Sequence, residues 1–153
     1  MGSLYKTYTI NTFDEYKRFS KILFMNKKNT VIICLVSVFL IFAGIVLNNW
    51  FFIAFAFLYP ALVTLMHNLR VTNIFKTNKA LKDVTVDFEF YDTFFTTSFE
   101  NGTTNLEYTK IYKIIETKTN FYLMIANNQG YVLCKNNFPD GLEDFLRNLK
   151  NSL

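Results

Sequence analysis

The chain has 153 residues, a formal net charge of +4 and a hydrophobic fraction of 51%. Its two cysteines, Cys34 and Cys134, lie far apart, which predicts neither a disulfide nor a metal-ligand pair and agrees with a reducing compartment. The basic charge is concentrated in residues 1–29 and 67–82, whereas residues 83–153 contain ten acids and six bases. An acidic domain argues against nucleic acid as a partner.

A short strand and a basic helix are predicted at the N-terminus. Tyr and Thr alternate with other residues within 1–11, which is typical of a strand, and we assign this segment as the first strand of a β domain. A helix is expected over 12–29, because Thr12 and Glu15 have the spacing of a capping box. Its apolar and basic residues fall on different faces, so it lies on a lipid surface, packs on the soluble domain, or does both.

Residues 30–66 contain no charged side chain. Two apolar runs in this segment are separated by Asn48 and Asn49, and each run falls at the short end of the roughly 17–25 residues that a membrane-spanning helix needs. Two core helices of a soluble protein are the alternative, but such helices usually carry a polar stripe. We therefore predict a two-helix transmembrane hairpin. Pro60 is expected to bend the second helix, either for function or for packing against the first.

Lysine and arginine flank the predicted hairpin on both sides, whereas the turn has none. Because short loops rich in these residues stay in the cytoplasm, both termini are expected there, with Asn49 on the outer face. The same residues are candidate contacts for anionic lipid headgroups, at about 1 kcal/mol each near a charged surface, unless they only set the topology. They are Lys17, Arg18, Lys21, Lys27, Lys28, Arg70, Lys76 and Lys79.

A helix or linker is expected over 67–82, followed by a β domain over 83–153. From Val84 to Phe90 apolar residues alternate with polar ones, which is typical of a strand with one buried face. Asn101-Gly102 predicts a two-residue hairpin turn rather than an N-glycosylation site, because this part is expected in the cytoplasm. Further short strands are expected over 94–99, 104–108, 111–117, 121–126 and 131–134.

An amphipathic helix is predicted at the end of the chain, capped by Asp140 with Glu143 three residues later. One face of this helix is apolar, and the open end of a β-sandwich is its available partner. The apolar residues are Leu142, Phe145, Leu146 and Leu149. About seven strands followed by a helix have the order of a pleckstrin-homology-like (PH-like) domain. The predicted fold is thus an α+β membrane protein, with a transmembrane hairpin inserted in a PH-like antiparallel β-sandwich or barrel that a C-terminal helix caps.

Three short motifs in this region resemble those of a known family: an E-T step, an aromatic-rich strand, and K-x-x-F before the last helix. They are formed by Glu116-Thr117, Phe121-Tyr122, and Lys135 with Phe138. On these residues the chain resembles the YcxB-like proteins, small bacterial membrane proteins with a two-span hairpin followed by a β-rich domain. The resemblance implies the PH-like fold and a location in the bacterial cell membrane. It implies no catalytic residue.

The sequence contains no recognisable catalytic pattern. His67 is the only histidine and has no second metal ligand at helical spacing, so we interpret it as a residue at the membrane edge. Asp87 and Glu89 are expected to be solvated rather than an acid–base pair. Neither a phosphate-binding glycine loop nor a nucleophile elbow occurs. The chain is therefore predicted not to be an enzyme and to need no metal and no cofactor.

Two non-catalytic functions remain open. In the first, the hairpin tethers the PH-like domain at the cytoplasmic face, where the domain binds a protein, peptide or lipid headgroup. In the second, the hairpin acts in the bilayer on a transporter or on another copy of the chain, helped by small residues at Ala43-Gly44 and at Ala54 with Ala56. The absence of a GxxxG motif weakens the second hypothesis. Expected partners are the bilayer and an unidentified protein or peptide, with a homo-oligomer under the second hypothesis.

Overall fold

The computed structural model describes residues 2–78, 82–99 and 102–153. The chain forms two compact units, one made of Met1–Glu15 with Ala80–Leu153 and the other of Tyr16–Lys79. We call them the β unit and the helical unit. The helical unit is therefore an insertion in the sequence of the β unit, after its first strand.

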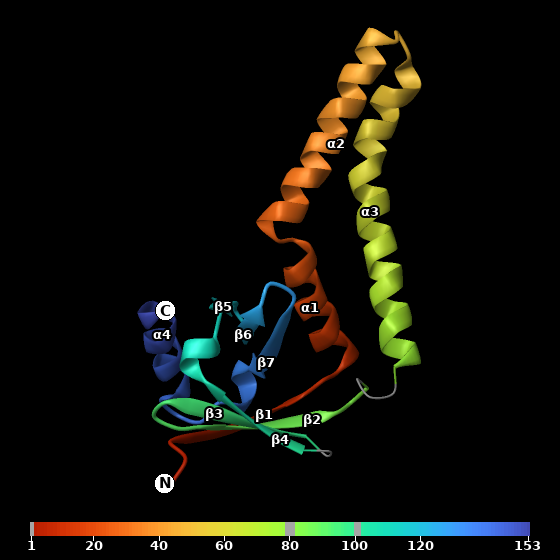
Figure 1. The fold of residues 1–153 in the computed structure, drawn as a ribbon. Helices are drawn as coiled ribbons and strands as arrows, with labels where there is room; N and C mark the ends of the chain where they lie inside the picture. The colour runs from red at the N-terminus through yellow and green to blue at the C-terminus, as the bar shows by residue number, and fades with distance from the viewer. Residues whose placement is uncertain (1, 79–81, 100–101) are drawn as a thin grey trace. The chain divides into compact units, whose positions relative to one another are not determined.

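The described part of the β unit contains seven strands, two short 3-10 helices and one α-helix (Figure 1). The strands are β1 (Tyr5–Ile10), β2 (Thr85–Phe90), β3 (Phe94–Phe99), β4 (Gly102–Glu107), β5 (Lys113–Glu116), β6 (Asn120–Ala126) and β7 (Gln129–Cys134). The helices are η1 (Tyr108–Lys110), η2 (Lys135–Asn137) and α4 (Leu142–Ser152). The predicted number of strands and the closing helix are confirmed.

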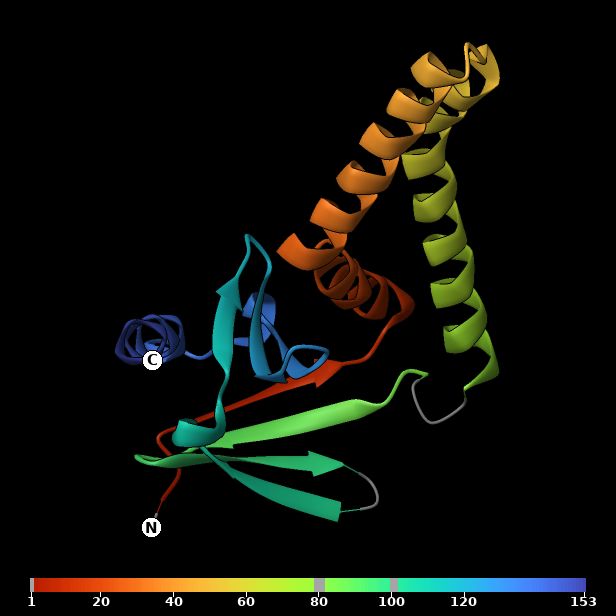
Figure 2. The ribbon, with the colours of Figure 1, turned by 45° about the horizontal axis from the view of Figure 1, so that its top comes forward.

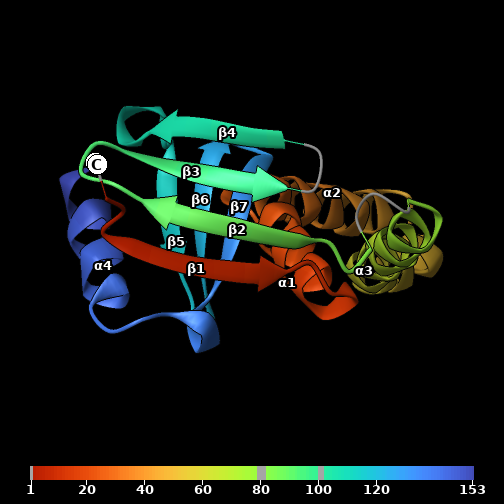
Figure 3. The ribbon, with the colours of Figure 1, turned by 90° about the horizontal axis from the view of Figure 1, so that it is seen from below.

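Two antiparallel sheets make up the β unit, one with the order β1-β2-β3-β4 and one with the order β5-β6-β7. Figure 3 shows the strands of one sheet running across those of the other. All six residues of β1 pair with β2, from Tyr5 opposite Phe90 to Ile10 opposite Thr85. The predicted N-terminal strand is thus part of the same sheet as strands that follow the helical unit.

Aromatic and aliphatic side chains from both sheets fill the core of the β unit. The predicted alternation of β2 holds, because Phe88 and Phe90 are buried while Asp87 is exposed. Phe95 stacks on Phe90, with ring centroids 5.8 Å apart, and meets Tyr131 of the other sheet edge-on at 5.7 Å. Full burial of a Phe side chain contributes about 1.5–3 kcal/mol, so these rings are major contributors to the stability of the β unit.

Helix α4 packs its apolar face on this core, as its sequence predicts. Leu142 and Leu146 are fully buried in the core cluster. The predicted cap is wrong: α4 starts after Gly141, whose φ of +86° is a left-handed conformation, and no side chain caps the helix. Glycine adopts that conformation without the steric cost of a Cβ, which explains why this residue, not Asp140, stands at the N-cap.

The helical unit contains α1 (Phe13–Phe24, whose first turn belongs to the β unit), α2 (Lys27–Val46) and α3 (Trp50–Thr77). Figures 1 and 2 show α2 and α3 side by side, joined at their tip. Asn48 has a φ of +50° in the tight turn, and the Asn49 side chain accepts a hydrogen bond of 3.0 Å from the Phe51 N–H. Asparagine suits both positions, because it tolerates left-handed backbone and caps helices.

Small residues allow α2 and α3 to approach closely. Gly44 is the buried residue of α2, and a Cβ on it would lie 2.5 Å from Ile53 Cγ1 and 3.1 Å from Ile53 N. Ala56 of α3 is also buried, whereas Ala54 is exposed. Pro60 lies inside α3, which continues on both sides of it.

Most side chains of α2 and α3 are exposed, although they are apolar. The most apolar windows of the two helices have mean hydropathies of 2.6 and 1.7, and only 6% of each window is buried. Core helices of a soluble protein would be mostly buried. By length and composition, both helices are long and apolar enough to cross a membrane.

The predicted hairpin turn at Asn101-Gly102 lies only partly within the described residues, because Asn101 is outside them. Gly102 pairs with Phe99 as the first residue of β4. Gly102 is therefore a strand residue in this structure.

Candidate functional site

Three features of the described structure are candidate functional sites: the basic residues of the helical unit, an ion cluster beside α4, and the outer edge of β4. Seven of the eight predicted lipid-contacting residues are described, and all seven are exposed. Three lie on α1, two in the first turn of α2 and two on α3. Lys79 lies outside the described residues.

The structure brings two of these lysines together at a hollow within the helical unit. The hollow has a volume of about 600 Å³ and is formed by residues of α1, α2, α3 and the α1–α2 connection. Lys17 and Lys21 contribute cations, and His67 and Asn68 contribute further polar groups. The other lining residues are Phe24, Met25, Thr30, Ile33, Cys34 and Thr64. Lys27, Lys28, Arg70 and Lys76 do not line it.

His67 packs within the helical unit rather than with other metal-binding side chains. Its ring stacks on Phe24, with centroids 4.1 Å apart and planes at 17°, and its Nε2 is 3.4 Å from Ser20 Oγ. No group of three or more potential metal ligands occurs among the residues that the structure describes. The position of His67 next to α1 was not evident from its sequence neighbours.

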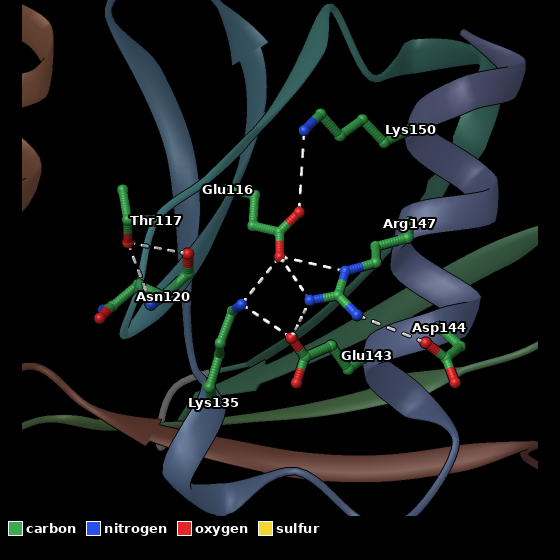
Figure 4. Close-up of polar contacts among 8 residues, drawn as sticks. All are labelled: Glu116, Thr117, Asn120, Lys135, Glu143, Asp144, Arg147 and Lys150. Carbon is green, nitrogen blue, oxygen red and sulfur yellow. Dashed lines mark hydrogen bonds and ion pairs between the residues drawn. The ribbon is translucent and has the colours of Figure 1, made fainter.

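Five charged residues of the β unit form an ion cluster around Glu116, the last residue of β5 (Figure 4). Glu116 Oε1 accepts a hydrogen bond of 2.8 Å from Lys135 Nζ and one of 3.0 Å from Arg147 Nη2. Glu143 accepts from the same two cations, at 2.8 Å and 2.5 Å. Lys150 Nζ lies 3.8 Å from Glu116 Oε2. The cluster therefore fastens α4 to the end of β5 and to η2.

These contacts stabilise the charged form of Glu116. The hydrogen bonds from Lys135 and Arg147 lower the pKa of the Glu116 carboxyl to about 2. Lys135 also lies 4.7 Å above the ring of Phe121, close enough for a cation–π contact. Since acids and bases are already paired with one another, we interpret this cluster as structural. Glu116 and Lys135, which belong to two of the motifs noted in the sequence, are therefore in direct contact.

The second residue of the E-T step has a local role. The Thr117 hydroxyl donates to the Asn120 carbonyl at 3.0 Å and accepts from the Asn120 N–H at 3.1 Å, which closes the turn between β5 and β6. Asn120 is completely buried, and its side-chain N–H₂ donates to Glu15 and, at 3.7 Å, to Cys134 Sγ. Asn120 lies just before the strand expected over 121–126, but it is the first residue of β6, and its buried role was not predicted.

Glu89 keeps contact with solvent, with a side-chain exposure of 34%, but it is also paired with neighbouring side chains. Glu89 accepts hydrogen bonds from Lys6 Nζ at 2.6 Å and from the Tyr91 hydroxyl at 2.7 Å. The hydrogen bond from Lys6, opposite it on β1, lowers the Glu89 pKa. Asp87, in contrast, is exposed. The two carboxylates therefore lie in different surroundings and do not form a shared site.

Strand β4 leaves one edge of the four-stranded sheet open within the described chain. The Tyr108 N–H donates to the Thr93 carbonyl at 3.1 Å, and hydrogen-bonding residues alternate along an antiparallel pair. It follows that the backbone N–H and C=O groups of Leu106 and Thr104 also point towards β3, whereas those of Asn105 point away from the sheet. A hollow of about 420 Å³ lies along this end of β4, lined by Thr93, Phe94, Asn105, Glu107 and Thr109.

The other edge of the same sheet is covered. The Cys134 N–H donates to Thr9 Oγ1 at 3.2 Å, and Asn137 Nδ2 donates to the Tyr8 carbonyl at 2.9 Å. Strand β1 therefore meets β7 and η2, and β4 is the edge of this sheet that is available to a partner.

Comparisons with known proteins support the resemblance seen in the sequence. No curated protein and no solved structure matches the chain. A family model described as YcxB-like protein matches residues 90–150, which run from the end of β2 into α4 and include Glu116, Lys135 and Phe138. The predicted resemblance is thus confirmed as a match to the YcxB-like family over residues 90–150.

Proposed function

We propose that this protein is an integral membrane protein whose hairpin holds a PH-like binding module at the cytoplasmic face of the bacterial cell membrane. The observation that carries the proposal is the exposure of the apolar side chains on α2 and α3. Exposed side chains of this kind include Phe39, Phe42 and Phe57, each more than 60% accessible. Removing such surface from water is strongly favourable, and a bilayer supplies the apolar surroundings.

The distribution of charge supports the cytoplasmic orientation of the β unit. Basic residues occur at the start of α2 and in the last third of α3, and the Leu47–Asn49 turn has none. Trp50 follows this turn and is 78% exposed, as expected for an aromatic residue at a membrane interface. Both ends of the hairpin would then lie on the same, cytoplasmic side, together with the β unit.

The β unit is proposed to bind its partner along β4. Two antiparallel sheets of four and three strands with a C-terminal helix are the arrangement of PH-like domains, and an open sheet edge accepts an extended peptide by adding a strand. The β4 residues Gly102–Asn105 are all exposed, and the adjacent hollow offers room for a side chain of the peptide. The proposal includes no catalytic step.

A proline in β4 tests this function. Asn105→Pro removes an outward N–H without breaking the pairing with β3, and proline is tolerated on an edge strand. Asn105→Ala is the matched control, because both variants lose the hydrogen bond between the Asn105 side chain and Thr96 Oγ1. Proteins that co-purify with the full chain from mild detergent should be lost from Asn105→Pro and retained by Asn105→Ala.

The same experiment separates the proposal from action within the bilayer. A variant in which exposed apolar residues of α2 and α3 are exchanged for other apolar residues keeps the mean hydropathy and the small residues Gly44 and Ala56. Our proposal expects this variant to retain its partners. Loss of the partners from the span variant, with retention by Asn105→Pro, would favour a regulatory or accessory role of the hairpin on a transporter or on another copy of the chain.

A further inference from the structure

The hollow of the helical unit combines cations with an apolar wall. Lys17 and Lys21 of α1 line it, together with Asn68 of α3, whereas Ile33 and Cys34 line it from α2. The described lining residues include no acid. An anion that enters the hollow would therefore find two ammonium groups and no carboxylate, while an attached hydrocarbon chain would find apolar contacts.

The polar side chains of the hollow differ in whether they already have hydrogen-bond partners. The hydroxyls of Thr30 and Thr64 donate to the backbone carbonyls of Asn26 and Pro60, at 3.2 Å and 2.8 Å. The side chains of Lys21 and Asn68, in contrast, have no hydrogen-bond or ion-pair partner within the described chain. These two side chains come from different helices and are free to donate to a ligand.

The hollow lies where the charge-free segment begins and ends. Thr30 is the first residue of the charge-free stretch 30–66, and Thr64 and His67 stand at its other end. In the membrane orientation proposed above, this level corresponds to the boundary between headgroups and hydrocarbon. A volume of about 600 Å³ is within the range of ligand pockets, roughly 300–1,000 Å³.

We propose that this hollow is a binding site for one anionic phospholipid. Its phosphate is held by Lys17, Lys21 and Asn68, and the start of an acyl chain lies against Ile33 and Cys34. This inference deepens the proposed function, on whose membrane orientation it rests: one lipid of defined charge would link α1 to the hairpin. A built site differs from general attraction to a charged surface: only the basic residues that line the hollow contribute to binding, although the other basic residues carry the same charge.

Native mass spectrometry of the full-length protein in neutral detergent tests the site. The probes are phosphatidylglycerol and phosphatidylcholine with identical acyl chains. The unmodified protein should bind one phosphatidylglycerol at least about tenfold more tightly than phosphatidylcholine, because two lysines near a phosphate contribute about 1 kcal/mol each. Equal binding of the two lipids would overturn the proposal.

Two double variants of equal charge provide the control. Lys17→Gln with Lys21→Gln should lower phosphatidylglycerol binding by at least about tenfold, whereas Lys27→Gln with Lys28→Gln should change it less than about twofold. A third variant, Cys34→Phe, keeps every charge but fills the hollow, and it should lose the bound lipid. Equal losses in the two double variants, or normal binding by Cys34→Phe, would show diffuse attraction and contradict a built site.

Two further measurements identify the source of the anion and separate a failure of the lipid site from a failure of the proposed membrane orientation. Excess inorganic phosphate should not displace the lipid; if it does, a soluble anion is the occupant and the lipid proposal is wrong. Labelling of Asn49→Cys from outside intact cells tests the membrane orientation separately. If that cysteine is labelled and no lipid selectivity is found, the hollow proposal alone fails; if it is protected, the proposed orientation fails as well.

Discussion

Glu116 is the residue on which the ion cluster of the β unit depends. Its carboxylate has a side-chain exposure of 20% and contacts Lys135, Arg147 and Lys150. We expect Glu116→Gln to destabilise the β unit by about 1–3 kcal/mol, because the partly buried Lys135 and the exposed Arg147 lose a charged acceptor. Hydrogen exchange of the full chain should show faster exchange in α4 and β5.

Asp144 provides the control for this substitution. Its side chain is 81% exposed and lies 3.5 Å from Arg147. An exposed ion pair contributes little, about 0–1 kcal/mol, so Asp144→Asn should leave the exchange rates nearly unchanged. Similar effects of the two substitutions would contradict the structural role of Glu116.

The pKa of Glu116 predicts how this contribution depends on pH. The hydrogen bond from Lys135 and then that from Arg147 hold the folded-state pKa at about 2, below the ordinary value of 4.5. A lowered carboxyl pKa gives stability that is complete above pH 4.5 and disappears as the pH falls towards 2. Unfolding measured over this range should become less pH-dependent in Glu116→Gln. An unchanged pH profile in that variant would assign the acid sensitivity to other carboxylates.

The members of this ion cluster were predictable from the sequence only in part. Glu116 and Lys135 were noted as motif residues, and Glu143 and Arg147 have the i,i+4 spacing that indicates a helical ion pair. Contact between these residues depends on the packing of α4 beside β5, and a local sequence pattern does not predict that packing. Asn120 was missed for the same reason, since a buried asparagine is explained only by its partners in other elements.

At the scale of elements, the approach of α2 and α3 depends on Gly44. A larger side chain at this position meets the backbone of Ile53, at 3.1 Å from the Cβ, and of Asn49, at 3.2 Å. Gly44→Leu should therefore destabilise the hairpin by about 1–3 kcal/mol through overpacking. Ala54→Leu, at an exposed position on α3, is the matched control and should have little effect. Thermal unfolding in detergent measures the difference; equal midpoints would contradict the close packing.

Strand β1 links the two parts of the β unit that the helical unit separates in sequence. The Asn11 N–H donates to the Val84 carbonyl at 2.8 Å, and the Asp83 N–H donates to the Asn11 carbonyl at 3.2 Å. The chain therefore leaves and re-enters the β unit at neighbouring positions. Residues 1–15 joined to residues 83–153 by a short Gly-Ser linker keep Glu15, the acceptor for Asn120, and should fold as a soluble β unit.

The matching variant lacks the first strand. Residues 83–153 alone would expose the edge of β2, which invites edge-to-edge aggregation. Size-exclusion chromatography should show a monomer for the joined chain and aggregates for the shorter one. Equal behaviour of the two chains would mean that β1 is dispensable.

For the whole molecule, hydrophobic pattern and strand spacing predicted most elements but not their assembly. The charge-free stretch 30–66 and the alternation in β2 indicated the apolar helices and the first strand after them, because both depend on local periodicity. The separation into sheets of four and three strands, and the hollow beside His67, arise from contacts between distant segments. The sequence therefore indicated basic residues near a membrane, but it did not indicate which of them share a site.

The orientation of the whole molecule should withstand the loss of one group of basic residues. Replacement of Lys17, Arg18 and Lys21 by Gln leaves Lys27 and Lys28 before the hairpin and the basic residues of α3 after it. We expect these residues to suffice for the proposed orientation, with both ends in the cytoplasm. An Asn49→Cys marker should still be labelled from outside intact cells in this variant, while a reporter after Leu153 stays active only in its cytoplasmic form.

Additional replacement of the remaining basic residues that flank the hairpin removes the charge difference between its two sides; they are Lys27, Lys28, Arg70, Lys76, Lys79 and Lys82. Because insertion follows the distribution of Lys and Arg in short flanking segments, we then expect a mixed orientation, with a fraction of the Asn49→Cys marker protected. A uniform outward marker in this last variant would mean that folding of the β unit, rather than the flanking charge, keeps both ends of the hairpin in the cytoplasm.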